Sequence, residues 1–131
     1  MNKKLLLSAA VAGAAMIAAG CSSMRAVDAA ADCRNGVMTD WHAHMTLYTF
    51  DKDGANPPKS NCTGYCETVW PPFKAQASDR DGGGYTKFKR DDGTLQWAYQ
   101  GKPLYYFIKD GKVGDKSGDN VNSVWHVASC K

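Results

Sequence analysis

Alternation of apolar and polar residues, rather than a helical period, dominates the chain after its first thirty residues. The clearest case is YTKFKRDDGTLQWAY, in which the large apolar residues Leu95, Trp97 and Tyr99 occupy alternate positions after an Asp-Gly step. Asp-Gly between alternating segments is a strong hairpin signal, because both residues tolerate a positive φ. The pattern predicts a hairpin with strands at Tyr85–Arg90 and Thr94–Tyr99. The same dipeptide recurs at 53–54, 81–82 and 110–111.

Further apolar segments predict four more strands and one short helical turn. The strands are expected at Gly36–Thr39, Met45–Phe50, Pro103–Ile108 and Ser123–Ala128. Asn61–Val69 is expected to hold one or two helical turns, which Trp70-Pro71-Pro72 ends. Ala75–Gly84 is rich in Gly, Ser and Asp and predicts an irregular connection. Together these elements predict a mostly β fold, a small antiparallel sandwich or barrel-like sheet.

The chain contains an internal repeat. LYTFDKDG at 47–54 and LYYFIKDG at 104–111 are nearly the same phrase, a loop follows each, and Val-Trp then recurs at 69–70 and 124–125. The shared order indicates a duplication, with repeats at about 45–74 and 102–128. A duplicated unit of this size hides its apolar face against its twin. We therefore expect two related halves packed together in one domain.

The repeated residues fit the motif Y-x-[FWY]-x-x-D. Its members are Tyr48, Phe50, Asp53, Tyr105, Phe107 and Asp110. The tyrosine and the phenylalanine of each copy share one side of a strand, and each aspartate is expected to accept hydrogen bonds from turn amides.

With the segments Cys62–Cys66, Val69–Pro72 and Asp119–Val127, the motif resembles the bacterial lipoproteins known as the secreted repeat of unknown function. That family has no established activity. The resemblance implies a small lipid-anchored envelope protein.

The N-terminus has the features of a lipoprotein signal peptide. A basic start, Met1–Lys4, precedes an apolar run, Leu5–Ala19, and small residues stand before Cys21. This arrangement resembles a lipobox, although Ala18 stands where Leu is usual. We expect cleavage after residue 20 and acylation of Cys21, with the lipid chains holding the protein on a membrane. Residues 21–32 are then a flexible tether and residues 33–131 a single β-rich domain.

Export also shapes the charge balance and the cysteine chemistry. Without residues 1–20 the chain has 14 basic and 13 acidic residues, a net charge of +1, and no basic stretch suited to nucleic acid. Four cysteines in an exported domain predict two disulfides, for which three connectivities are open. We favour Cys62–Cys66 with Cys33–Cys130, which ties the ends of the domain together. The Cys62–Cys66 spacing lacks the pattern of haem attachment or of a thioredoxin-like pair, and a static cross-link is preferred over a redox role.

One cluster suggests metal binding. His42 and His44 share a face if the chain is extended there, and Met45 follows them. Imidazole and thioether ligands suit copper, so these three residues are a candidate copper site, which Met24 and His126 join if the fold brings them near. A polar turn with exposed histidines is the preferred interpretation of the segment. Asp51–Gly54 begins like a calcium loop but lacks the spaced carboxylates of an EF-hand, so a turn is preferred.

No G-x-S-x-G or H-E-x-x-H motif is present, and the sequence predicts no enzyme and no cofactor apart from that copper. Most of the aromatic residues are expected to belong to the core, and those that are exposed are candidates to bind a glycan or an envelope protein. The candidates are Trp41, Trp70, Trp97, Trp125, Tyr65 and Tyr106. The preferred function is a lipid-anchored, non-enzymatic envelope protein, structural or ligand-binding; the alternative is a copper-binding or thiol-redox protein. In a Gram-negative cell, Ser22 after the lipidated cysteine indicates the periplasmic face of the outer membrane.

Overall fold

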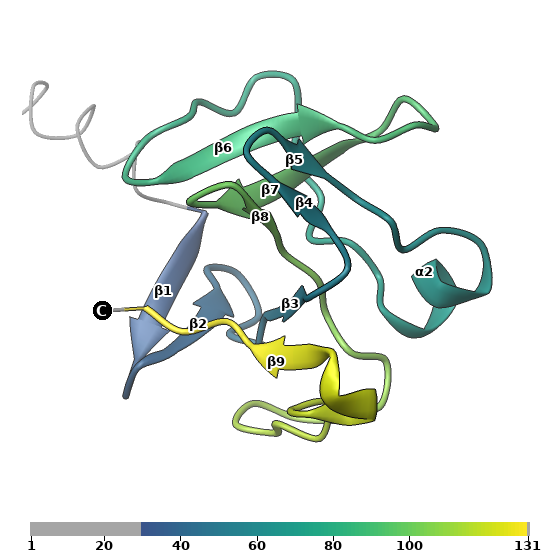
Figure 1. Ribbon diagram of the computed structural model, residues 1–131. Helices are drawn as coiled ribbons and strands as arrows, with labels where there is room; N and C mark the ends of the chain where they lie inside the picture. Colours follow the sequence, from purple (N-terminus) through teal and green to yellow (C-terminus); the bar gives the residue numbers. More distant parts are fainter. Residues whose placement is uncertain (1–29, 131) are drawn as a thin grey trace, which may run out of the picture.

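The computed structural model describes residues 30–130 (Figure 1). The expected signal peptide, Cys21 and most of the tether lie outside the described residues. In chain order the elements are β1 (Ala31–Arg34), β2 (Val37–Asp40), β3 (Tyr48–Phe50), β4 (Gly54–Ala55), β5 (Pro58–Lys59), α2 (Tyr65–Val69), β6 (Tyr85–Lys89), β7 (Leu95–Tyr99), β8 (Lys102–Pro103), the 3₁₀ helix η3 (Val121–Ser123) and β9 (Trp125–Val127).

The fold is mostly β, as the sequence predicts, and its strands form several small antiparallel sheets. β1 pairs with β2, β3 with β9, β4 with β5, and β6–β7–β8 form a three-stranded sheet. Figure 1 shows β6, β7 and β8 on one side of the molecule and β3 and β9 on the other. An isolated antiparallel bridge between Tyr48 and Tyr105 joins the segments at the centre.

The hairpin predicted around Asp92-Gly93 is confirmed. β6 pairs with β7 from Tyr85↔Tyr99 to Lys89↔Leu95. Gly93 has a φ of 89°, and the Asp92 side chain accepts a hydrogen bond from the Thr94 amide at 2.9 Å. A left-handed residue at this point explains why glycine follows the aspartate.

The other Asp-Gly steps join no paired strands, so the expectation of hairpins there is wrong. The pattern missed two hairpins. One has its turn at Asn35-Gly36, between β1 and β2, and the other at the cis Asn56-Pro57 bond, between β4 and β5. Asp53 and Asp110 are instead engaged by side chains from distant parts of the chain.

The strand predicted at Pro103–Ile108 is much shorter than expected. β8 ends at Pro103, because the following residues change pairing partner at each step. The Leu104 amide donates to Trp97 O at 3.0 Å, whereas the Tyr105 amide donates to Tyr48 O at 3.0 Å. A segment that alternates between partners forms bridges rather than a continuous ladder.

Two further boundaries differ from the prediction. Ser123 lies in η3 with a φ of 59°, so the last strand begins only at Trp125. Ala31 and Asp32, assigned to the tether from the sequence, already pair with Asp40 and Thr39 in β1. The short helical turn expected within Asn61–Val69 is present as α2.

Buried apolar residues form two clusters. The first contains Met38, Leu47, Phe73, Trp97, Leu104 and Ala128, and the second contains Tyr48, Cys62, Trp70, Tyr105, Phe107 and Trp125. Both clusters draw on both repeats, so neither repeat has a core of its own.

The favoured disulfide connectivity is confirmed. Cys33–Cys130 fastens β1 to the end of the chain, and Cys62–Cys66 closes the loop that leads into α2. Within residues 30–130, no helix has the length and apolar character needed to cross a membrane.

Candidate functional site

The two copies of the repeat motif are joined by reciprocal hydrogen bonds. The Tyr48 hydroxyl donates to Asp110 Oδ2 at 2.6 Å, and the Tyr105 hydroxyl donates to Asp53 Oδ2 at 2.6 Å. Between them the Tyr48 amide donates to Tyr105 O at 2.8 Å, and the Tyr105 amide donates back to Tyr48 O at 3.0 Å. The tyrosine of each repeat therefore binds the aspartate of the other, an arrangement we term the cross-repeat clasp.

A stack of four rings follows the same exchange. Phe50 of the first repeat stacks on Trp125 of the second at a centroid distance of 4.2 Å, and Phe107 of the second stacks on Trp70 of the first at 4.2 Å. Trp70 and Trp125 stack on each other at 3.8 Å, almost parallel. Trp97 is also buried. Three of the four tryptophans proposed as surface binders thus belong to the core.

The motif aspartates accept amide hydrogen bonds as expected, but the amides lie beyond their own turns. Asp53 Oδ1 accepts from the Asn61 amide at 2.7 Å, and Asp110 Oδ1 accepts from the Ser117 amide at 2.9 Å. Burial raises the pKa of Asp53, against the lowering effect of its hydrogen bonds. Both oxygens of each carboxylate are therefore engaged by other parts of the protein.

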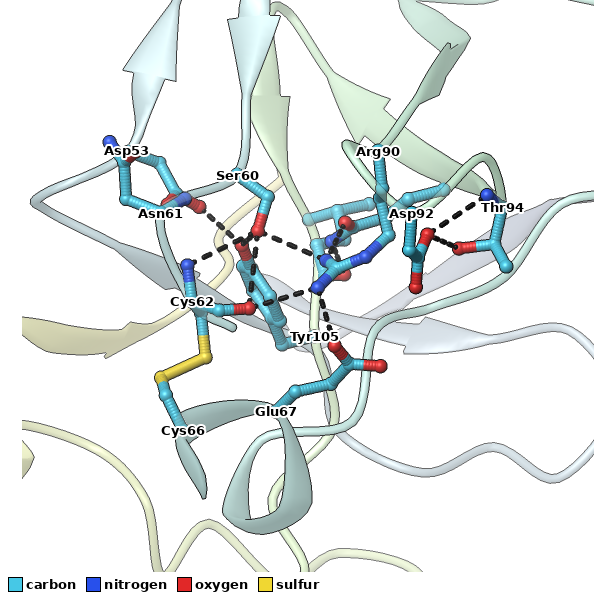
Figure 2. A network of polar contacts seen from close by, with 12 residues as sticks. Asp53, Ser60, Asn61, Cys62, Cys66, Glu67, Arg90, Asp92, Thr94 and Tyr105 are labelled. Carbon is cyan, nitrogen blue, oxygen red and sulfur yellow. Dashed lines mark hydrogen bonds and ion pairs between the residues drawn. A yellow bond between two sulfur atoms is a disulfide. The ribbon is translucent and has the colours of Figure 1, made fainter. Parts of the chain in front are cut away.

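The second feature is a buried arginine without a counterpart in the other half (Figure 2). Arg90 Nη1 donates to Ser60 Oγ at 3.0 Å and to Gln96 Oε1 at 2.6 Å. Its Nη2 donates to Cys62 O at 2.9 Å and to Glu67 Oε1 at 2.9 Å. The guanidinium thereby fastens the disulfide loop and α2 to the end of β6. Because Cys62 has no exposed surface, this arrangement favours a static cross-link.

The loop that contains the candidate copper ligands is a tight turn. Asp40 is buried, and its side-chain oxygens accept from the Ala43 amide at 2.9 Å and the Met45 amide at 2.8 Å. His44 has a φ of 59°. The segment is therefore a polar turn, as preferred from the sequence, and not the extended strand that would place His42 and His44 on one face. The buried carboxylate draws the chain back on itself.

This turn presents an indole to solvent. Trp41 is 50% exposed and Tyr65 is 81% exposed, whereas Tyr106 is half-buried. Of the aromatic residues proposed as surface binders, only Trp41 and Tyr65 are thus largely accessible. Since two backbone amides of the turn bind one buried carboxylate, the indole is held on a fixed backbone.

A groove of about 420 Å³ lies beside the turn, and we call it the Trp41 groove. It is lined by Ala30, Trp41, His42, Phe73, Lys74, Gln76, Asp79, Arg80, Tyr85 and Trp97. The walls come from the turn, from the connection after α2, and from β6 and β7. Burial, and then the neighbouring Tyr99 and Asp32, raise the pKa of Tyr85 to about 12, so this phenol is neutral at physiological pH.

The connection expected to be irregular forms one side of this groove, and hydrogen bonds hold it in place. Asp79 Oδ2 accepts from the Gln76 amide at 2.8 Å, and Lys87 Nζ donates to Ala77 O at 2.8 Å and to Asp79 O. Among residues 30–130, neither Lys74 nor Arg80 forms an ion pair. The groove therefore presents two cations whose charges no carboxylate neutralises directly.

The proposed metal ligands are only partly brought together. Within the part of the chain that the structure describes, no three His, Cys, Asp or Glu side chains gather closely enough to hold a metal ion. His126, a further ligand considered, lies in β9 with its Nε2 2.8 Å from Asp51 Oδ2. His42 lines the Trp41 groove, while Nδ1 of His44 is buried without a hydrogen-bond partner.

Comparison with known proteins bears on the repeats. A family model described as a secreted repeat of unknown function matches residues 41–74 and 86–129. The chain belongs to this family. No curated protein and no solved structure gives a significant match. Membership of the secreted-repeat family agrees with export from the cytoplasm and with the duplication expected from the sequence.

The structural equivalence of the halves extends beyond the repeats predicted at about 45–74 and 102–128. The Met38 amide donates to Ala128 O at 2.9 Å, and the Trp97 amide donates to Phe73 O at 2.9 Å. Each of these residues then accepts from the leucine that begins the motif phrase of its own half. The hairpins β1–β2 and β6–β7 are therefore equivalent in these hydrogen bonds, although the first family match begins after β1–β2, at residue 41, and the second begins within β6, at residue 86.

Several of these residues could not be recognised as site residues in the sequence. Arg90 precedes Asp-Asp-Gly and looks like a solvated turn residue, and Ser60 and Gln96 belong to no motif. Asp40 did carry a signal, because an aspartate at a strand end before a short loop commonly binds loop amides.

Proposed function

We propose that this protein is a lipid-anchored, non-enzymatic module of the bacterial envelope that binds a glycan in the Trp41 groove. The observation that carries the proposal is the half-exposed Trp41 ring, which lies beside cationic and hydrogen-bonding side chains. The ring projects from a turn whose backbone amides bind the Asp40 carboxylate. An apolar platform with a few convergent polar groups is the general form of a small-ligand site, and about 420 Å³ lies within the size range of about 300–1,000 Å³ for such sites.

The glycan proposal is tested by binding of oligosaccharides to the purified protein, followed through tryptophan fluorescence. Trp41→Ala removes the platform and should weaken binding at least tenfold. Tyr65→Ala, which removes an exposed aromatic ring that does not line the groove, is the matched control and should bind normally. Equal weakening by both variants, or by neither, would argue against the groove.

The lipid anchor is supported by the residues that precede Cys21 and by membership of a secreted family. Cells fed an alkyne-tagged palmitate should label the wild-type protein, and the label should be lost in Cys21→Ser. Cys21→Ser is also expected to remain uncleaved. A labelled Cys21→Ser protein, or an unlabelled wild type, would contradict the anchor.

The non-enzymatic part of the proposal is supported by how the repeated polar residues are used. The motif tyrosines and aspartates are committed to one another in the cross-repeat clasp. A hydroxyl that donates to a carboxylate from inside a protein core is poorly placed to meet a substrate. The same commitment supports a structural role for the motif and favours a ligand site elsewhere on the protein.

A second candidate function is copper binding at the Trp41 turn. It is favoured by Nδ1 of His44, which is buried without a partner, and by the thioether of Met45 next in the chain. Calorimetric titration with Cu(I) would test it: His42→Ala with His44→Ala should abolish binding, while His126→Ala should leave it unchanged. Equal affinity in all three proteins would rule the site out.

A further inference from the structure

The cations of the Trp41 groove specify the charge of its ligand. Lys74 and Arg80 are exposed and line the groove without an ion pair among the described residues. Asp79 is the acidic residue of the lining, and one of its carboxylate oxygens accepts from the Gln76 amide. Asp32, which lies near Tyr85, is paired with Arg34 at 3.3 Å. The lining therefore has a net charge of +1, because Lys74 and Arg80 stand against the single carboxylate of Asp79.

The aromatic side of the groove is uncharged. Trp41 carries no charge, and the phenol of Tyr85 is neutral at physiological pH, as tyrosines ordinarily are. His42, beside Trp41, offers a further hydrogen-bonding group. A ligand that fills the groove thus meets a flat apolar surface at one part and two cations at another. Among envelope components, a sugar with an acidic substituent has both complementary features.

We propose that the Trp41 groove recognises an anionic sugar, one that bears a carboxylate or a phosphate, and that Arg80 and Lys74 select it over its neutral counterpart. This inference rests on the proposed function and adds the substrate class. Arginine binds carboxylate and phosphate oxygens through paired N–H groups, whereas lysine acts as a point charge. Arg80 is therefore the main determinant of selectivity and Lys74 contributes less.

An anionic membrane surface is the other partner that would use these charges. The groove opens beside Ala30, nine residues after Cys21, so a lipid anchor would keep it within about 30 Å of the bilayer. The concave shape and the aromatic walls favour a discrete sugar over a flat array of headgroups. Vesicles are included in the test so that binding to a membrane surface can be distinguished from binding to a sugar.

The test uses the full-length protein, purified in a nonionic detergent, and two matched pairs of probes. One pair is trigalacturonate and its carboxyl-reduced neutral form; the other is a phosphorylated mannotriose and its dephosphorylated form. Dissociation constants are measured for wild type, Arg80→Gln, Lys74→Gln and Trp41→Ala. Lys116→Gln is the control, because Lys116 is an exposed cation outside the groove. Phosphatidylglycerol vesicles are titrated in parallel.

At least one anionic trisaccharide should bind ten times or more tightly than its neutral form, because a charged hydrogen bond is lost in the latter. Arg80→Gln should reduce the ratio of anionic to neutral affinity about tenfold without changing the affinity for the neutral form, and Lys74→Gln should reduce this ratio less. Trp41→Ala should weaken the binding of both forms. Equal binding of anionic and neutral forms, with dependence on Trp41, would overturn the charge selectivity and leave the proposed function intact. Binding of none of the four trisaccharides would overturn both, and Arg80-dependent binding of vesicles alone would assign the groove to the membrane.

Discussion

The two repeats carry the same clasp but close the loop behind it in different ways. In the first repeat, Asn61 is held by the motif aspartate and is followed by buried Cys62, whose disulfide leads into α2. In the second, Ser117 is held in the same way and is followed by Gly118, whose amide donates to Tyr48 Oη at 3.2 Å. Equivalent positions thus hold a cross-linked side chain in one half and no side chain in the other.

The comparison separates what holds the molecule together from what distinguishes its surface. Each repeat supplies one tyrosine and one aspartate to the clasp and two rings to the stack, so both features need both halves. The turn that contains Trp41 and the connection at 75–84 occur once, and together they supply half of the residues that line the Trp41 groove. We infer that duplication supplied a rigid frame and that the unrepeated segments acquired the binding surface.

The largest expected effect comes from the disulfide that joins the halves. Replacing Cys33 and Cys130 together by Ser should lower the free energy of unfolding by about 4–5 kcal/mol, since the bond closes 97 residues. Replacing Cys62 and Cys66 should cost only about 2 kcal/mol, because that bond spans four. Urea unfolding of both variants measures the difference. A larger loss for the short loop would show that the first repeat depends on its local cross-link.

Gly118 tests the tighter packing of the second repeat. A Cβ at this position would lie 2.7 Å from Trp70 and 2.9 Å from Tyr48. Gly118→Ala should therefore destabilise the protein by about 2–3 kcal/mol through overpacking. The control is Gly111→Ala, whose nearest new contact is at 3.9 Å and which should stay within about 0.5 kcal/mol of wild type. Similar thermal unfolding of both variants would mean that Trp70 and Tyr48 can move enough to accommodate a methyl group at residue 118.

Much of this frame could be predicted from the sequence because it is repeated. The alternation of Leu95, Trp97 and Tyr99 gave the best hairpin, and four cysteines in an exported chain gave the disulfides. The exchange of partners between repeats could not be predicted, since Y-x-F-x-x-D shows which residues recur but not which copy each one meets. The end of the strand at Pro103 could not be predicted for the same reason, since Leu104 and Tyr105 bind the backbone of different segments.

The candidate site was predictable in its residues and not in its shape. Trp41, His42 and His44 stood out in the sequence, and a polar turn was preferred for their segment, but the sequence did not show which distant residues this turn would face. Lys74, Arg80 and Tyr85 are distant from that turn in sequence, so no local pattern joins them to it. Their proximity depends on the packing of the connection at 75–84 against β6.

The symmetry of the clasp is tested by removing one hydroxyl at a time. Tyr48→Phe and Tyr105→Phe should each cost about 1–2 kcal/mol, because each leaves a partly buried carboxylate without its donor. Guanidinium unfolding should give values within about 1 kcal/mol of each other. A cost confined to one variant would show that a single half carries the clasp.

The smallest effect is expected at alkaline pH. Burial, followed by the charge and hydrogen bond of the partner aspartate, raises the pKa of Tyr105 above its ordinary value of 10.0, and burial and Asp110 do the same for Tyr48. A raised pKa in the folded state means that stability is present below pH 10 and falls as the pH rises above it, because the unfolded chain loses protons first.

Between pH 10 and 11 each of these tyrosines should therefore contribute at most about 1 kcal/mol to the loss of stability. Each Tyr→Phe variant should lose that much less than wild type over this interval, as measured by urea midpoints at both pH values. Tyr65→Phe is the control, because its ring is 81% exposed. If a Tyr→Phe variant loses as much stability as wild type between pH 10 and 11, the tyrosine that it replaces does not cause the alkaline loss of stability.

The exchange of partners between the repeats is tested most directly by two double-mutant cycles on the free energy of unfolding. One combines Tyr48→Phe with Asp110→Asn, a pair joined across the repeats, and the other combines Tyr48→Phe with Asp53→Asn, a pair within one repeat. The cross-repeat pair should show a coupling of about 1 kcal/mol or more, and the pair within one repeat should be additive to within about 0.5 kcal/mol. Stronger coupling within the repeat than across it would contradict the clasp.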